Sequence, residues 1–256
     1  MSALRPVSLP TSVQRDLWWR SLALQAVWNH QRMQNLGLLY VLGVWARWRG
    51  LDADECRRLA RRHVGYFNTN PYLAPYLLGG LARLEDEHRE GGQPPEALLG
   101  AFRDSLSRAC GALGDQLTWL GGRPAVMLLA ALQGWWFGWW WSLVILAAAT
   151  VVQLALRWRA VGRGWALGLD VVSVFERRIW HCAILWSGRL GLVLTGLLAG
   201  LFFAGGMASA TGPGAVRLLA VLVIGVGVAV VPSRRHTCEA QFLVGLALLA
   251  ALGLVI

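Results

Sequence analysis

This sequence predicts an all-α, polytopic integral membrane protein, with amphipathic and hairpin helices in its N-terminal half and several transmembrane helices in its C-terminal half. Three observations support this fold class. The chain of 256 residues is 56% hydrophobic. Its mean hydropathy of +0.47 exceeds what one soluble core of this size needs. Its charged residues lie at the edges of apolar runs that are long enough to cross a bilayer. We expect one domain over residues 1–256, with an amphipathic and hairpin part over 1–110 and a transmembrane part over 111–256.

The charge and the cysteines exclude several function classes. The formal net charge is +10, and all 24 basic residues are arginine. These arginines flank apolar runs, which is typical of charges that orient a protein in a bilayer. They form no continuous basic stripe, so no nucleic acid is expected as a partner. The four cysteines are scattered and form no CxxC pair, so neither a disulfide framework nor a zinc site is expected. No metal and no cofactor are predicted, and no cleavable signal peptide is visible.

The first elements are expected to be amphipathic. Apolar residues recur at helical spacing over residues 17–50, which predicts one amphipathic helix or two in series, able to lie against a membrane or a partner helix. Residues 52–63 begin with acidic side chains and end with arginines, the polarity that a helix dipole favours, and this helix is expected to be solvated.

The next segment is expected to contain the clearest loop of the chain. Residues 77–97 run from a glycine pair through a group of charges to a Gly/Pro break. Within it Glu85, Asp86 and Glu87 are expected to form a solvated face. From Glu96 onward an apolar stripe at steps of three and four residues continues into the following segment.

A helical hairpin is predicted in the middle of the chain. No charged residue occurs over residues 125–156, which is longer than the about 20 residues of a simple span. The run contains GWWFGWWW at residues 134–141, and clustered indoles around glycines suit a turn at the membrane interface. We expect arms over residues 113–133 and 135–156. The arginines that follow the second arm and the arginine-rich N-terminal part then both lie in the cytoplasm.

Three further crossings are expected in the C-terminal part. Residues 190–216 are uncharged and end at TGPG, a turn expected to face outward. Residues 218–232 lead back to Arg234 and Arg235, which indicate the inner side. Residues 240–256 form a last, shorter crossing that places the C-terminus outside.

Four stretches, in this order, carry a family resemblance. They are RSLALQAVWNHQRMQNLGLLY (20–40), GYFNTNPYLAPYLLGGLARLEDE (65–87), ALGDQLTWLGGRP (112–124) and LGLD (167–170). Together they resemble the IID subunit of the mannose/fructose/sorbose family of bacterial sugar phosphotransferase system (PTS) permeases, and the resemblance covers nearly the whole chain.

The resemblance implies group translocation at the bacterial cytoplasmic (inner) membrane by a multi-pass protein. In that family a IIC and a IID subunit form the sugar-conducting unit, as an oligomer of IIC–IID heterodimers. Phosphoryl groups pass from histidine on IIA to histidine on IIB and then to the incoming hexose. The chain is therefore expected to be a transport subunit and not an enzyme, with no catalytic residue of its own.

Some residues depart from the family pattern. Cys110 and Ala112 interrupt a glycine-rich approach to the Gly-Asp pair, and His30 stands where an aromatic residue is expected. These departures motivate an alternative, in which the chain is a IID-like membrane scaffold or regulatory protein that no longer transports sugar.

Asn68 and Asn70 are the leading candidates for substrate binding. Each amide offers one acceptor and two donors, which suits the hydroxyl groups of a sugar in an otherwise apolar site. The structural alternative is that Asn70 caps a helix that starts at Pro71 while Asn68 holds the turn.

The remaining candidates are Asp115, Trp119, Trp28 and Asn29. Asp115 lies in the first hairpin arm, where an ionisable side chain usually faces a cavity or a partner. It either acts in transport or stays at the inner interface, where Arg123 pairs with it or with IIC. Trp119 and Trp28 lie inside the quoted motifs and are candidates to stack on sugar rings, whereas the tryptophans of residues 135–141 are expected to anchor the interface.

Asn29 belongs to an amide-rich stretch that is expected to line the sugar path or to bond to the partner subunit. Its other amides are Gln25, Gln34 and Asn35. The histidines at positions 63, 88, 181 and 236 are expected to be solvated or capping.

Overall fold

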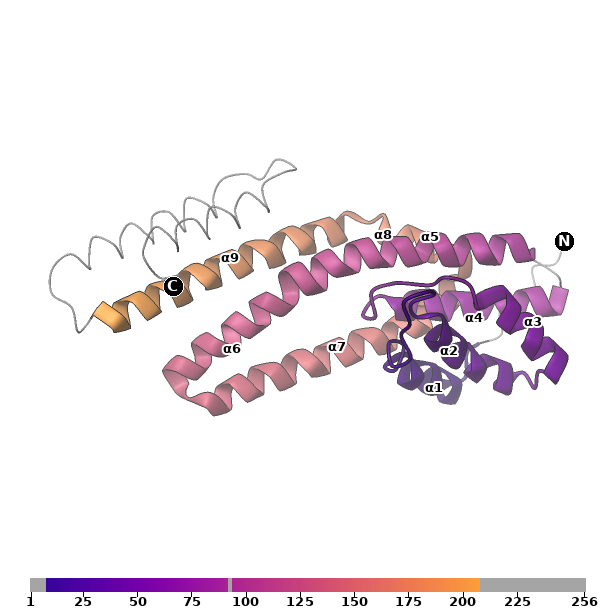
Figure 1. Ribbon diagram of the computed structural model, residues 1–256, viewed down its shortest axis with the longest axis horizontal. Helices are drawn as coiled ribbons and strands as arrows, with labels where there is room; N and C mark the ends of the chain where they lie inside the picture. Colours follow the sequence, from indigo (N-terminus) through magenta and orange to yellow (C-terminus); the bar gives the residue numbers. More distant parts are fainter. Residues whose placement is uncertain (1–7, 92–93, 208–256) are drawn as a thin grey trace. The chain divides into compact units, whose positions relative to one another are not determined.

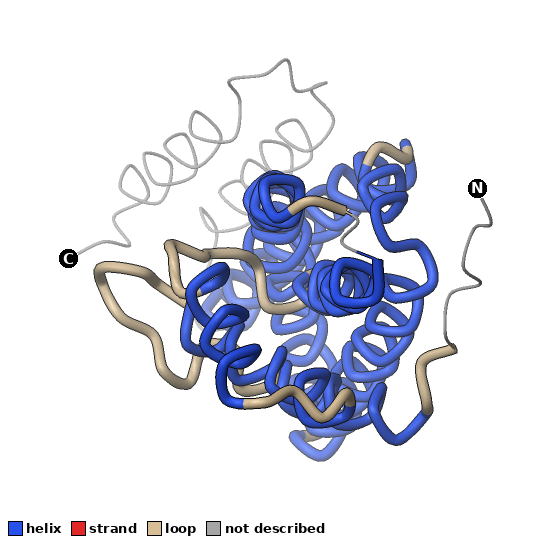
Figure 2. The backbone as a smooth tube through the Cα atoms, turned by 90° about the vertical axis from the view of Figure 1, so that its right-hand side faces the viewer, coloured by secondary structure: helices blue, strands red, loops and turns tan. Residues whose placement is uncertain are grey.

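The computed structural model describes residues 8–91 and 94–207, and the described chain is helical, without a β-strand (Figures 1 and 2). This confirms the all-α prediction. The α-helices are α1 (Thr11–Ser21), α2 (Asn35–Trp48), α3 (Ala53–His63), α4 (Ala74–Gly91), α5 (Glu96–Gly114), α6 (Arg123–Phe137), α7 (Trp139–Leu167), α8 (Val171–Phe175) and α9 (Arg178–Met207). A π-helix, η1 (Asp115–Gly122), joins α5 to α6, and a 3₁₀ turn, η2 (Gly168–Asp170), follows α7.

The chain divides into two compact units, Met1–Ser187 and Gly188–Ile256. The helices α1 to α8 and all the site residues considered below belong to the first unit. Of the expected C-terminal crossings, only residues 190–207 of the first are described, within α9. The rest of that crossing, the crossings predicted at 218–232 and 240–256, the turn at 211–214 and the arginine pair at 234–235 lie outside the described residues.

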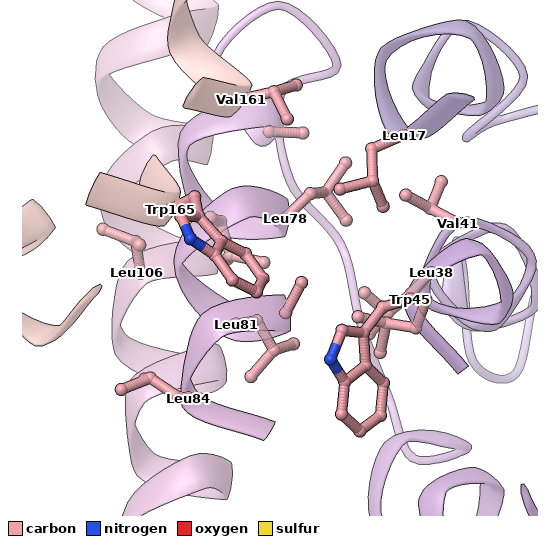
Figure 3. Packing of buried hydrophobic residues seen from close by; sticks show 14 of the residues in the cluster. Leu17, Leu38, Val41, Trp45, Leu78, Leu81, Leu84, Leu106, Val161 and Trp165 are labelled. Carbon is pink, nitrogen blue, oxygen red and sulfur yellow. The ribbon is translucent and has the colours of Figure 1, made fainter. Parts of the chain in front are cut away.

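The core of the first unit is built around α4. Six of its apolar side chains, at positions 74, 77, 78, 81, 82 and 84, are completely buried. Figure 3 shows how residues of several helices converge on it, among them Leu17 of α1, Trp45 of α2, Leu106 of α5 and Trp165 of α7. The N-terminal helices therefore share one continuous apolar core with the C-terminal part of α7.

The backbones of α4 and α7 are in direct contact because glycines line their crossing. A Cβ atom at Gly79 would lie 2.1 Å from the carbonyl oxygen of Val161. A Cβ atom at Gly164 would lie 2.1 Å from the carbonyl oxygen of Tyr76. Small residues are what allow two helix backbones to approach so closely.

The predicted hairpin is present and turns where the tryptophans cluster. α6 ends at Phe137, Gly138 has a φ of 90°, and α7 begins at Trp139. A positive φ is readily adopted only by glycine. The hydroxyl of Ser142 on α7 donates to the carbonyl oxygen of Ala130 on α6, 2.7 Å away. The first arm is longer than predicted, because α5, η1 and α6 form one continuous helical segment over residues 96–137.

Two helical segments are long and apolar enough to cross a bilayer, Trp139–Phe175 and Arg178–Leu198. α7 alone has 29 residues, which corresponds to about 43 Å at 1.5 Å per residue, against about 30 Å for the hydrocarbon core of a bilayer. The part of α7 that exceeds the hydrocarbon thickness is its C-terminal end, which packs on α4.

Over residues 17–50 the structure has two helices in series, one of the two arrangements expected, and not one continuous helix. α1 and α2 are separate, and residues 22–34 form turns with isolated bridges that pair Met33 with Asn29 and with Phe67. The amide side chains explain this. The Asn29 side chain accepts from the backbone nitrogen of Arg32 and donates to the carbonyl oxygen of Met33, so it replaces helical hydrogen bonds with local ones.

The expectation of a loop over residues 77–97 is wrong as far as Gly91, where α4 ends, and the described non-helical residues of this stretch are Pro94 and Pro95. Glu85 is completely buried and Asp86 nearly so, which corrects the prediction of a solvated acidic face. Asp86 pairs with Arg49 and accepts from the indole nitrogen of Trp45. Glu85 pairs with Arg62 and lies 2.6 Å from Nε2 of His63. Cationic and aromatic groups of α2 and α3 therefore satisfy both carboxylates.

α3 has the predicted polarity. Asp52 accepts from the backbone nitrogen of Glu55, and the Glu55 carboxylate accepts from the backbone nitrogen of Asp52, which together form a capping box. The far end of α3 is not solvated as expected, because His63 is completely buried against Glu85.

Candidate functional site

Asn70 is the centre of a polar cluster beside the apolar core. It lies in the loop between α3 and α4 and is only 1% exposed. Its Oδ1 accepts from the backbone nitrogen of Tyr72, and its carbonyl oxygen accepts from Ala74, the first residue of α4. The Asn70 side chain thus closes the turn over residues 71–73 that leads into α4, which begins at Ala74 and not at Pro71 as the structural alternative expected.

The amide nitrogen of Asn70 reaches across to η1. It donates to Oδ1 of Asp115 at 2.8 Å and to the hydroxyl of Thr118 at 3.0 Å. Thr118 in turn donates to the carbonyl oxygen of Gly114 at 2.7 Å. The structure thus brings together two of the predicted site residues, Asn70 and Asp115, and adds Thr118. We call these three residues the polar cluster.

The π-helical geometry of η1 positions the polar cluster. π-helical turns inside α-helices are rare and occur frequently at functional sites. A Cβ atom on Gly114 would lie 2.4 Å from Cβ of Asn70, so only glycine lets the Asn70 side chain lie against this segment. Asp115 is exposed, and its second carboxylate oxygen makes no hydrogen bond with the described part of the chain. One face of the cluster is therefore open to a ligand.

Aromatic rings flank the polar cluster. Tyr72 and Trp119 meet edge to face with ring centroids 5.8 Å apart, and Trp119 is 39% exposed. The guanidinium of Arg123 lies 4.7 Å from the ring centroid of Trp119. Arg123 therefore stacks on Trp119, and no ion pair joins it to Asp115 among the described residues. An exposed ring beside hydrogen-bonding groups suits a sugar, which has both apolar faces and hydroxyl edges.

Asn68 points elsewhere. It is exposed and makes no hydrogen bond within the described residues, and it lines a separate cavity of about 450 Å³ between the α3–α4 loop and α5. Asn70 is buried against η1, whereas Asn68, two residues earlier, is exposed. The predicted pair is thus divided between two places.

The remaining candidates lie outside the polar cluster. Trp28 is exposed and packs edge to face on His30. Asn29 donates to Oδ1 of Asn35 at 3.0 Å, inside the α1–α2 loop. Gln34 is buried and pairs with the backbone of Thr69 in both directions, which fixes the segment that carries Asn70.

Sequence reasoning missed Tyr72, Thr118 and Arg157. The first two lie inside the quoted motifs and could have been chosen as polar residues within apolar segments. Arg157 is buried, donates to the carbonyl oxygen of Ser21 at 2.8 Å, and lies 5.8 Å from the ring centroid of Tyr72. It links α7 and the end of α1 to the aromatic flank. Among the described residues no group of three His, Cys, Asp or Glu side chains is placed to hold a metal ion.

Comparisons with known proteins give the family. Residues 8–208 match the family model described as the PTS system mannose/fructose/sorbose family IID component. The mannose-specific EIID component of Escherichia coli K12 is 30% identical over 185 residues, which cover 72% of this chain and 65% of that protein. The sorbose-specific EIID component of Klebsiella pneumoniae is 26% identical over 184 residues, covering 72% of this chain and 67% of that protein. The chain therefore spans about two thirds of the length of these relatives.

Solved structures agree with this assignment. The cryo-EM structure of the mannose transporter ManYZ in complex with microcin E492 matches with a TM-score of 0.58 and 26% identity, over 75% of this chain and 70% of that one. A second structure, described as a membrane protein, matches with a TM-score of 0.68 and 27% identity, over 75% and 71% of the two chains. On the family match over most of its length, this chain belongs to the IID components of the mannose/fructose/sorbose family of the PTS.

Proposed function

We propose that this chain is a membrane subunit of a PTS sugar permease, which translocates a hexose of the mannose/fructose/sorbose type together with a IIC subunit. The observation that carries this proposal is the polar cluster of Asn70, Asp115 and Thr118 beside the exposed ring of Trp119. The open carboxylate oxygen of Asp115 accepts a hydroxyl, and the indole offers an apolar face to the sugar ring. The substrates named for the relatives support this class of ligand.

The hairpin supports a multi-pass position in the bacterial cytoplasmic membrane. Its tip carries five tryptophans that are each more than half exposed, as expected for indoles at headgroup level, at positions 135, 136, 139, 140 and 141. The opposite end of the α7 span carries Arg157, Arg159 and Arg163. This distribution of arginine supports a cytoplasmic position for the N-terminal helices.

The partners follow from the same proposal. A IIC subunit completes the sugar path, and IIC–IID heterodimers assemble into a larger oligomer in the bilayer. IIA and IIB carry the phosphoryl group, and IIB transfers it to the hexose, so this chain transports and is not the phosphotransferase. Its exposed apolar side chains, such as Leu120, Val151 and Ile179, suit contact with lipid or with IIC.

The first test is uptake of labelled mannose, fructose and sorbose by cells that express this chain with its IIC, IIB and IIA partners. Asn70→Ala removes the donor to Asp115 and Thr118. An unpaired buried polar group costs about 1–3 kcal/mol, so uptake is expected to fall roughly 10- to 100-fold while membrane insertion persists. Asn68→Ala is expected to give a smaller loss.

Arg61→Ala is the control, because Arg61 is an exposed polar residue of α3 outside the cluster. Its uptake should equal that of the wild type. Unchanged uptake in Asn70→Ala would show that this amide has only a capping role. Uptake by this subunit without any IIC would contradict the proposed complex. Full insertion and assembly without uptake of any of these hexoses would favour the scaffold or regulatory alternative.

A second prediction tests the geometry without removing any polar group. Gly114→Ala places a methyl group 2.4 Å from the Asn70 side chain, which must move away from Asp115 and Thr118. Uptake is expected to fall by at least tenfold. Gly100→Ala in α5 is the control, because nothing lies within 4 Å of its added carbon, and it should keep normal uptake. Equal uptake in the two variants would show that the position of Asn70 does not matter for transport.

A further inference from the structure

A second polar site adjoins the segment that carries Asn68 and Asn70, and none of the three residues of the polar cluster lines it. Its cavity of about 450 Å³ is formed by the α3–α4 loop and one face of α5. Ligand pockets in proteins commonly have volumes of about 300–1,000 Å³. Tyr66 and Asn68 line it from the loop, and Arg103, Asp104, Ser107 and Arg108 line it from α5. The cavity is thus adjacent to the polar cluster but separate from it.

Two arginines dominate the charge of this cavity. Arg103 is buried and held in place, since its Nε donates to Asp104 at 2.8 Å and one of its terminal nitrogens donates to the carbonyl oxygen of Arg62 at 2.8 Å. Its other terminal nitrogen makes no hydrogen bond with the described part of the chain. Arg108 is exposed and has neither a hydrogen bond nor an ion pair there. Asp104 balances only one of the two cations, so the cavity has a net positive charge.

The neutral lining groups are also available. Neither the hydroxyl of Tyr66 nor the amide of Asn68 has a hydrogen-bond partner within the described residues, and both residues are exposed. Ser107 donates to the carbonyl oxygen of Asp104 at 3.0 Å and keeps its lone pairs free to accept. Guanidinium groups bind phosphate oxygens, while phenol and amide groups bind hydroxyls.

We propose that this cavity binds a small phosphate monoester that also carries hydroxyl groups, with its phosphate between Arg103 and Arg108 and its hydroxyls at Asn68 and Tyr66. The preference for a phosphate monoester follows from the cavity itself. Its identity as the phosphorylated sugar rests on the proposed function, in which that product forms on the cytoplasmic side. The cavity is then a site that holds the product after phosphoryl transfer.

Calorimetric titration of the purified complex with IIC, in neutral detergent, tests this site. Mannose 6-phosphate, mannose and inorganic phosphate are titrated separately at one ionic strength. Mannose 6-phosphate is expected to bind at least tenfold more tightly than either of the others. Arg108→Gln should weaken its binding at least tenfold, whereas Arg58→Gln, an exposed arginine of α3, should leave it unchanged. Asn68→Ala should weaken mannose 6-phosphate but not inorganic phosphate.

Several outcomes overturn the proposal. Equal affinity for inorganic phosphate and mannose 6-phosphate would mean that the cavity holds an adventitious ion only. If Arg108→Gln and Arg58→Gln change the affinity for mannose 6-phosphate equally, the arginines of the cavity act only through the general surface charge. If mannose 6-phosphate binds in nanodiscs of phosphatidylcholine but not in nanodiscs of phosphatidylglycerol, the anionic lipid competes for the cavity. The cavity would then be a site for a lipid headgroup.

The two proposals fail in different ways. Normal sugar uptake with no binding of mannose 6-phosphate would remove the product site and leave the proposed function standing. Binding that depends on Arg108, in a complex that takes up no sugar, would support the site and remove the transport assignment.

Discussion

Gly79→Val is expected to prevent the chain from accumulating as a folded protein. The new Cβ would lie 2.1 Å from the carbonyl oxygen of Val161, and this neighbour belongs to helix backbone, which cannot rotate away as a side chain can. Overpacking a core usually costs about 1–3 kcal/mol, and the cost is larger where backbone must move. Because α4 is the centre of the core, its separation from α7 would expose the apolar surfaces of the helices around it.

Gly100→Val is the matched control for this prediction. Gly100 lies inside α5, and no atom lies within 4 Å of an added carbon. The measurement is the yield of monodisperse protein after detergent extraction and gel filtration, followed by the thermal unfolding midpoint from tryptophan fluorescence. Wild type and Gly100→Val should agree, and Gly79→Val should give little or no monodisperse protein. A Gly79→Val protein with the wild-type yield and Tm would contradict the backbone contact between α4 and α7.

Glu85→Ala is expected to be the most destabilising loss of a charged side chain. Glu85 is completely buried, where it pairs with Arg62 and contacts His63. Removing one partner of a buried ion pair costs about 3–5 kcal/mol. Arg62 keeps a second partner, Glu96, so the lower end of this range is expected. For a chain of this size such a loss lowers the Tm by roughly 10 °C. Glu87→Ala on the same helix is the control. The Glu87 side chain is 41% exposed and forms a surface ion pair with Arg83, so its loss should shift the Tm only slightly.

The same pair makes stability depend on pH. Burial raises the pKa of the Glu85 carboxyl, but the hydrogen bonds and charges of His63 and Arg62 outweigh burial and hold this pKa below its ordinary value of 4.5. A carboxyl with a lowered pKa contributes stability that is fully present above the unfolded-state value and is lost as the pH falls through the folded-state value. The Tm of the wild type should therefore fall below about pH 4.5, and its advantage over Glu85→Ala should shrink there. A Tm difference between the wild type and Glu85→Ala that stays constant from pH 7 to pH 3.5 would exclude this linkage.

Sequence patterns predicted the hairpin and the family because their signals are local. The tip needs indoles beside a glycine, and Gly138 with its positive φ lies among the tryptophans of α6 and α7. The family motifs likewise placed Asn70 and Asp115 in separate segments, and the structure joins them by a hydrogen bond.

The buried carboxylates could not be predicted from local sequence. A run such as LEDEHRE has the composition of a solvated helix face, and the partners of Glu85 and Asp86 come from α2 and α3, far away along the chain. Burial of these charges becomes visible only when three helices are assembled. The different roles of Asn68 and Asn70 were hidden for a similar reason, because only the packing of η1 decides which amide faces the core.

The wide turns of η1 also set the rotational phase between the two helices they join. An α-helix advances by about 100° per residue, so a single extra residue would normally turn every later side chain away from its partner. A segment of i→i+5 turns absorbs such a residue locally. α5 can therefore keep Phe102 and Leu106 toward the core while α6 keeps Ala130 toward α7. Deleting one residue from positions 115–122 would therefore restore plain α-helix while α6 keeps its inner surface toward α7.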